Sequence, residues 1–139
     1  MKYQLLFLLL SLCISVKAQD LEKHQWKHRI LLIISEDETS GLVKLQLELL
    51  DEPAPLNERK LIIYRLHPKQ YRIIGSNNTD WIMDSTSYDK YNSEGHEFKT
   101  VLIGLDGGVK LEAHDVLDSE KLFFTIDRMP MRQRELRDH

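Results

Sequence analysis

One group of side chains that could do chemistry is the acidic run Glu36-Asp37-Glu38, directly after an apolar segment. Adjacent carboxylates could bind a cation, or could raise one another's pKa so that one of them serves as a general base. The alternative is a solvated loop that brings negative charge to the N-terminus of a following helix. Ser35 precedes the run and could be a nucleophile only with a base beside it, and the sequence identifies no such base.

Two histidine pairs could also do chemistry. His24 and His28 are four residues apart, a spacing that can bind a metal ion, but no third ligand lies near them in the sequence. His96 and His114 flank a predicted hairpin and could approach each other, and His114 with Asp115 could form an acid–base pair. Because such residues are also common on protein surfaces, the sequence assigns no catalytic, cofactor-binding or metal-binding residue, and we expect no cofactor.

The elements that must position these groups follow from the apolar pattern. Residues 29–35 contain five consecutive apolar residues, which is typical of a strand buried on both faces. Residues 42–50 have apolar side chains at spacings of three and four, which predicts a helix that Pro53 and Pro55 end, although Leu45, Leu47 and Leu49 also alternate as in a strand. Residues 60–66 predict a second strand. A strand, a helix and a second strand predict a parallel pair with a right-handed crossover.

The C-terminal third contains the clearest pattern. Apolar residues across 98–112 flank Asp106-Gly107-Gly108, which predicts a β-hairpin with a type I′ turn, because that turn needs positive φ at both central residues. Residues 118–129 predict a closing helix, which Pro130 ends. The remaining residues, 131–139, are predicted to be a basic, solvated tail that could instead dock on an acidic partner.

The segment 67–96 is harder to interpret. Residues 71–74 are consistent with a short strand and residues 84–91 with a short helix. Asn77-Asn78-Thr79 matches the acceptor pattern for N-glycosylation, which matters only in a eukaryotic secretory pathway. Five aromatic residues lie in and around this segment, and we expect core packing for most of them rather than an exposed contact patch: Tyr64, Tyr71, Trp81, Tyr88 and Tyr91.

Residues 1–18 have the layout of a secretory signal peptide. Lys2 precedes an apolar run that is too short to span a membrane, and small or modest side chains before Gln19 predict cleavage between Ala18 and Gln19. The alternatives are an uncleaved anchor and a lipoprotein modified at Cys13. We therefore expect a secreted or periplasmic protein without a transmembrane span.

Charge and cysteine content narrow the possible functions. The 139 residues suit one domain, predicted as residues 19–139, in which 19–28 form a polar lead-in anchored by Trp26. Loss of the leader removes two lysines and no acid, so the net charge of −3 becomes −5, which disfavours nucleic acid as a partner. It also removes Cys13, the one cysteine, and with it thiol nucleophiles, thiolate metal ligands and disulfides.

The order of the predicted elements is that of a thioredoxin-like α/β domain, a βαβ unit followed by a C-terminal β-hairpin and a closing helix. Four stretches also resemble an uncharacterised family of exported bacterial proteins, which is similar to the peroxiredoxin-like DUDES domain of vertebrate sushi-repeat and extracellular-matrix proteins. These stretches are Trp26-Lys27-His28-Arg29, Glu58-Arg59-Lys60-Leu61, the hairpin 98–111, and Asp127-Arg128-Met129-Pro130-Met131-Arg132.

The resemblance implies a thioredoxin-like fold in an extracellular or periplasmic setting and implies no established activity. A reactive cysteine of that fold would lie within residues 35–41, and its cis-proline within residues 95–99, but neither residue is present there. We therefore expect a non-redox binding or structural module whose partner is a protein or an envelope or matrix component. The alternative is a cysteine-independent enzyme that uses carboxylates, histidines or a cation bound near the end of the first strand.

Overall fold

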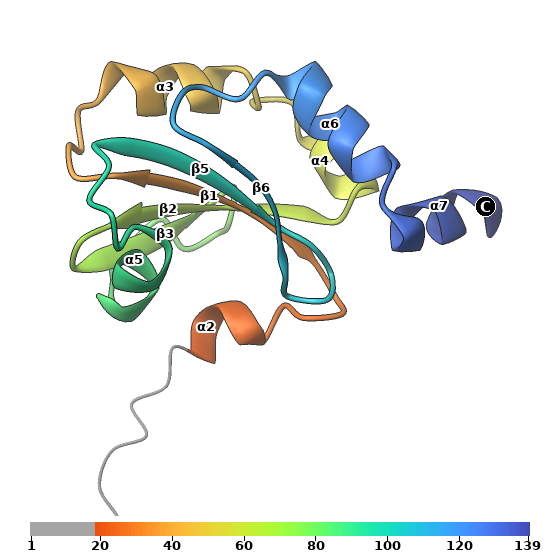
Figure 1. The fold of residues 1–139 in the computed structure, drawn as a ribbon, viewed down its shortest axis with the longest axis horizontal. Helices are drawn as coiled ribbons and strands as arrows, with labels where there is room; N and C mark the ends of the chain where they lie inside the picture. The colour runs from red at the N-terminus through yellow and green to blue at the C-terminus, as the bar shows by residue number, and fades with distance from the viewer. Residues whose placement is uncertain (1–18) are drawn as a thin grey trace, which may run out of the picture.

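The computed structural model describes residues 19–139; the predicted leader, residues 1–18, lies outside them. Six strands form one sheet in the order β4-β3-β2-β1-β5-β6, and helices cover both of its faces (Figure 1). The strands are β1 (Arg29–Ser35), β2 (Leu61–His67), β3 (Gln70–Ile74), β4 (Ile82–Met83), β5 (Phe98–Ile103) and β6 (Val109–Ala113). The helices are α2 (Gln19–Glu22), α3 (Gly41–Glu48), α4 (Pro53–Glu58), α5 (Thr86–Tyr91), α6 (Ser119–Asp127) and α7 (Pro130–Arg137).

Strand β1 lies at the centre of the sheet, and all seven of its residues are buried, as its apolar run predicts. It pairs in parallel with β2, beginning at Arg29 opposite Leu61, and antiparallel with β5, from Ile30 opposite Ile103. The predicted parallel pair and the predicted hairpin of β5 and β6 are therefore both present.

Alternate residues of β1 feed two hydrophobic cores, because successive side chains of a strand point to opposite faces. Leu31 and Ile33 join the core beneath α3 and α6. The neighbouring residues of β1 join the second core, on the face that carries α5, together with Tyr64, Tyr71 and Tyr88. These three tyrosines are core residues, as expected.

Helix α3 turns Val43 and the amide of Gln46 inward and leaves Leu42 and Leu45 exposed, as is Leu49 directly after the helix. Helix α3 already ends at Glu48, before the predicted stop at Pro53, and Pro53 begins α4 instead. Proline suits the first position of a helix, where the missing N–H would have no partner and the fixed φ is already helical.

The hairpin turn differs from the predicted type I′ turn. Positive φ occurs at Gly107, at 80°, but not at Asp106, so the condition for a type I′ turn is not met. The Gly107 N–H donates to the Gly104 carbonyl at 3.0 Å, and the Gly104 N–H donates to the Gly108 carbonyl at 2.9 Å. The register between β5 and β6 shifts beside this turn.

The C-terminal residues, predicted to be a solvated tail, form helix α7. Helix α6 is capped by Asp118, whose carboxylate accepts the Lys121 N–H, and ends at Asp127. Pro130 begins the next helix instead of ending the chain's regular structure. Arg132 of α7 is buried and holds this helix against the domain.

Trp26, predicted to anchor the lead-in, is 63% exposed and has a φ of 66°. The lead-in includes α2 and is held by other groups. Leu21 packs on the second core, His24 is buried, and the Trp26 backbone N–H donates to the Leu105 carbonyl. A positive φ is rare for so large a side chain and costs conformational energy.

The whole arrangement is the predicted α/β, thioredoxin-like one. A parallel βαβ unit is flanked by an antiparallel hairpin, with α3, α4 and α6 on one face of the sheet and α5 and α2 on the other (Figure 1). Strands β3 and β4 extend the sheet beyond β2. In the part of the chain that the structure describes, no helix has the length and apolar character needed to cross a bilayer.

Candidate functional site

The loop after β1, where the thiol of a thioredoxin-like fold would lie, is closed by its own hydrogen bonds. The Ser35 hydroxyl accepts the Asp37 N–H and donates to the Asp37 carbonyl, at 3.2 and 3.3 Å. The Asp37 carboxylate accepts both the hydroxyl and the N–H of Thr39, and these bonds hold the pKa of Asp37 below its ordinary value. Of the two interpretations of this run, the general base of raised pKa does not apply to Asp37.

The flanking acids of this loop bind side chains from elsewhere in the fold. Tyr88 donates its hydroxyl to Glu36 at 3.1 Å, and Gln70 donates its amide to Glu38 at 3.0 Å. Arg65 donates to the Glu38 backbone carbonyl. These hydrogen bonds brace the acidic run, so residues 35–39 form a braced loop. Nowhere in residues 19–139 do three potential metal-ligating side chains come together.

The first histidine pair is part of a hydrogen-bonded connection to the core. The His24 Nε2 lies 2.7 Å from the Tyr64 hydroxyl, and its Nδ1 lies 3.3 Å from the Nδ1 of His28. His24 and Tyr64 are buried. The pair therefore positions the lead-in against β2.

The second histidine pair comes together as predicted. The rings of His96 and His114 have centroids 4.0 Å apart, and the His96 Nε2 lies 2.7 Å from a carboxylate oxygen of Glu94. That hydrogen bond lowers the pKa of Glu94. The carboxylate of Asp115 accepts the Val116 N–H, so this acid caps its own loop.

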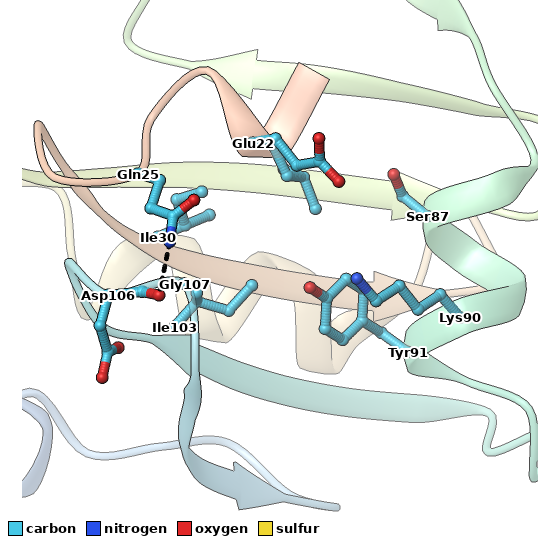
Figure 2. A pocket seen from close by; sticks show the side chains of 10 residues that line it. Glu22, Gln25, Ile30, Ser87, Lys90, Tyr91, Ile103, Asp106 and Gly107 are labelled. Atoms are coloured by element: carbon cyan, nitrogen blue, oxygen red, sulfur yellow. Dashed lines mark hydrogen bonds between the residues drawn. The ribbon is translucent and has the colours of Figure 1, made fainter. Parts of the chain in front are cut away.

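A pocket of about 210 Å³ lies between α2, α5 and the hairpin turn, on the α5 face of the sheet (Figure 2). Gln25 closes one side by donating its amide to the Asp106 carbonyl at 2.9 Å. Lys90 lies along the ring of Tyr91, with its ammonium 5.1 Å from the ring centroid. Glu22 also lines this pocket, near α2. With Lys90, the pocket therefore has both an acidic and a basic side chain in its lining.

At the opposite end of β1 from the braced loop, a charged network surrounds Arg29. This side chain is fully buried, and its Nη1 donates to the Arg59 carbonyl at 2.9 Å and contacts Glu135 at 3.3 Å. Glu135 also pairs with Lys60 at 3.5 Å and with Arg132 at 3.4 Å. Burial alone would raise the pKa of Glu135, but the charge of Arg29 and the neighbouring cations lower it.

The network continues through α7 to the helices that flank it. Arg132 pairs with Asp127 at 3.2 Å and with Glu58 at 2.7 Å, and Arg59 pairs with Asp127 at 2.7 Å. It contains four cations and three carboxylates: Arg29, Arg59, Lys60 and Arg132 against Glu58, Asp127 and Glu135. One positive charge is therefore not balanced within it.

A second pocket, of about 340 Å³, adjoins Arg29 and has a size at the low end of ligand sites. Its lining comes from the start of β1, the hairpin turn and the junction of α6 with α7. Arg29, Gly104 and Leu105 are its buried members, while Trp26 and Lys110 are exposed. The exposed tryptophan with a strained backbone is consistent with a functional role for this pocket.

One family model matches most of the described chain. Residues 20–135 match the model of the Domain of unknown function (DUF4174), so the chain is a member of that family. No curated protein and no solved structure gave a match.

Sequence reasoning missed the Arg29 pocket because it weighed acids, histidines and nucleophiles. Two signals were nevertheless present. Arg29 is a charged residue at the start of an apolar buried strand, and Arg132 ends the stretch Asp127-Arg128-Met129-Pro130-Met131-Arg132 that carries the resemblance. A buried arginine requires partners. An arginine at the start of a buried strand therefore predicts acidic side chains beside it, and the C-terminal stretch supplies such acids.

Proposed function

We propose that this DUF4174 protein is an exported, thioredoxin-like binding module without thiol redox chemistry. The observation that carries the proposal is the braced loop after β1, in which Ser35 and Asp37 satisfy each other where a reactive thiol would lie. A thiol reaction at that place would need a thiolate with access to its substrate. The fold supplies a scaffold, and its pockets supply sites for a ligand.

Export and the loss of the leader belong to the same proposal. Cleavage between Ala18 and Gln19 would remove Cys13 and leave a secreted or periplasmic chain with no sulfhydryl. The resemblance of four sequence stretches to the DUDES domain of matrix proteins supports, within this proposal, a partner that is a protein or an envelope or matrix component. These statements rest on the sequence pattern of the leader and on the resemblance.

Two assays and one mass measurement test this proposal. The protein, purified as its cells process it, should reduce no insulin disulfide and consume no peroxide, with thioredoxin and a peroxiredoxin as positive controls. Its intact mass should correspond to a chain that begins at Gln19. Turnover in either assay, a mass that includes Met1, or a lipid on Cys13 would contradict the proposal.

A further inference from the structure

We infer that a groove between helices α3 and α4 and strands β2 and β3 binds a free fatty acid, with Arg65 and Arg72 holding its carboxylate and the groove holding its aliphatic chain. The inference names the ligand class of the binding module proposed above and rests on that proposal. It follows from the pairing of two arginines, their free donors, the apolar groove beside them and the local charge.

The first observation is a pair of arginines in direct register. Arg65 of β2 lies opposite Arg72 of β3. Like charges directly opposite each other destabilise a strand pair. Arg65 is only 7% exposed, so water screens this repulsion weakly. Neither arginine forms an ion pair with a carboxylate of residues 19–139, so the described chain leaves the pair without a bonded anion.

The second observation is that most donors of this pair are free and reach solvent. Arg65 uses its Nη2 for the Glu38 backbone carbonyl. The Nε of Arg72 is buried without a partner, whereas the remaining donors of both guanidiniums have no partner among residues 19–139 and are open to solvent. Two N–H groups of a guanidinium match the two oxygens of a carboxylate.

Trp81 packs against the arginine pair and leaves these donors available. The pairing of Tyr71 with Ile82 places Trp81 next in register, opposite Arg72. The centroid of the Trp81 ring lies 5.2 Å from the Cζ of Arg65 and 5.0 Å from that of Arg72. A ring face attracts a cation but does not replace a carboxylate as a hydrogen-bond acceptor.

The third observation is an apolar groove on the α3 face of the sheet. Leu47, Leu50 and Leu56 line it from the helices, and the paired Ile63 and Ile74 line it from the strands. Its volume of about 510 Å³ lies within the range of ligand sites. A groove with such walls suits an aliphatic chain.

The arginine pair continues this groove along the strands. Arg65 follows Ile63 by two residues, and Arg72 precedes Ile74 by two, so both pairs project from the same face of the sheet. Two residues of a strand span about 7 Å. An acid whose chain lies on the isoleucines would therefore bring its carboxylate to the arginines within a few methylene groups.

The fourth observation is the local charge, which favours a head group with one negative charge. Burial and the charge of Arg72 lower the pKa of Arg65, while the charges of Glu38 and Asp37 act in the opposite direction. These two acids belong to the braced loop. A carboxylate adds one negative charge beside two arginines, whereas a phosphate dianion would meet stronger repulsion from both acids.

The first test uses octanoate and its uncharged amide as matched probes, with binding measured by calorimetry on the protein purified as its cells process it. The acid should bind saturably and the amide at least about tenfold more weakly, because only the acid makes charged hydrogen bonds to the arginines. No binding of the acid, or equal binding of the two probes, would overturn the inference.

A series of chain lengths tests the groove. From hexanoate to octanoate to decanoate, each pair of added methylenes should strengthen binding about five- to fifteenfold, because each methylene is buried against apolar walls. Ile74→Thr should weaken binding of octanoate about threefold or more, and Val109→Thr, an exposed strand residue outside the groove, should not. Affinity independent of chain length would show a site for the head group alone and would contradict the inference.

Removal of one arginine tests the head group. Arg72→Met should fold, because its guanidinium makes no hydrogen bond or ion pair in the described chain, and should bind octanoate at least about tenfold more weakly. Lys69→Met removes an exposed positive charge three residues away and is the matched control, with less than a twofold change expected. Full affinity in Arg72→Met, or equal losses in both variants, would refute the assigned role.

Fluorescence and vesicles locate the ligand. Trp26→Phe leaves Trp81 as the one tryptophan of the chain, and octanoate should change its emission because the carboxylate binds beside it. Vesicles of dioleoylphosphatidylglycerol should not retain the protein, because the inference places a free acid and not a bilayer at this groove. An unchanged Trp81 signal, or retention on vesicles that Arg72→Met abolishes, would overturn the inference.

The two proposals can fail separately. Redox turnover by a protein that still binds octanoate through Arg72 would refute the proposed lack of thiol chemistry and leave the fatty-acid site standing. Absence of both turnover and octanoate binding would refute the fatty-acid site and leave a non-redox module with another ligand.

Discussion

Arg29 is the one charged residue of β1, and its side chain lies where the sheet, the end of α4 and helix α7 meet. Its burial is compensated on one edge of the guanidinium by Glu135 and the Arg59 carbonyl. Because a buried charge without partners is strongly unfavourable, the acids of this network are needed for the fold itself. At the scale of single residues, Arg29 both pairs with Glu135 of α7 and lines the neighbouring pocket, so the packing of α7 and the shape of the pocket depend on the same side chain.

Arg132 should be the most sensitive position of this network for stability. Arg132→Met removes a side chain that is 4% exposed and leaves Asp127, Glu58 and Glu135 without one of their cations. Breaking a buried ion pair commonly costs about 3–5 kcal/mol, and the partial exposure of the acids lowers our expectation to about 2–3 kcal/mol. Chemical denaturation measures the change in the free energy of unfolding.

The matched control is Arg134→Met, two residues along the same helix and exposed to solvent. It should change the free energy of unfolding by less than about 0.5 kcal/mol. Equal losses in the two variants would show that the helix tolerates no change of charge, and would contradict a specific role for the buried network.

Among the elements, α3 is joined to the segment before α6 by one buried amide. Gln46 donates to the Leu117 carbonyl at 3.0 Å and accepts the Leu117 N–H at 2.7 Å. Both residues are buried, so water cannot replace either bond. This double hydrogen bond fixes the connection that follows β6 over the first core.

Gln46→Met should destabilise the fold by about 2–4 kcal/mol, because a side chain of similar size would leave the buried N–H and carbonyl of Leu117 without partners. Thermal and denaturant unfolding would measure the loss. Lys44→Met, on the exposed face of the same helix, is the control and should stay within about 0.5 kcal/mol of the native protein. A loss below about 1 kcal/mol in Gln46→Met would contradict the assigned role.

The elements that the sequence predicts well are those with local signals. The apolar run of residues 29–35, the hairpin signal at Gly107 and the cap at Asp118 all led to the correct strand, hairpin and helix. Prolines were less informative. Pro53 and Pro130 lie beyond the ends of α3 and α6, and each begins the next helix, because proline suits the first turn of a helix.

Helix α7 could not be predicted from local pattern because its partners are distant in the sequence. Most residues of α7 are charged or polar. The helix therefore has no continuous apolar stripe that would predict its packing against the domain. Arg132 reaches Glu58, 74 residues away, and Glu135 reaches Arg29, 106 residues away. The candidate pocket depends on the same long-range contacts, whereas the contact of His96 with His114 follows from the hairpin alone.

At the scale of the whole molecule, the two ends of β1 have opposite characters. The end at Ser35 is closed by a loop that satisfies its own polar groups. At the other end, Arg29 has two buried donors without a partner among residues 19–139, and a pocket adjoins it. Helix α7 packs at the second end (Figure 1). A ligand site at this end would use a part of the thioredoxin-like scaffold that lies away from the position of its thiol.

The paired carboxylates also predict how the stability of the whole molecule depends on pH. Burial by itself would raise the pKa of Asp127, but hydrogen bonds from Arg59 and Arg132 outweigh it and lower that pKa below the ordinary 3.8. A carboxyl whose pKa is lower in the folded state stabilises the fold above its unfolded pKa, and this contribution is lost as the pH falls through the folded value. Asp127 and Glu135 therefore contribute fully near neutrality and progressively less below about pH 4.5.

Denaturant unfolding at pH 7 and at pH 3.5 should accordingly show a large loss of stability in the native protein. Asp127→Asn should be less stable at pH 7, and its loss between the two pH values should be smaller, because the variant has one fewer carboxylate to protonate. Asp51→Asn, at an exposed residue for which the described chain shows no ion pair, should follow the native profile. A native protein as stable at pH 3.5 as at pH 7, or parallel profiles for it and Asp127→Asn, would show that these ion pairs do not support the fold.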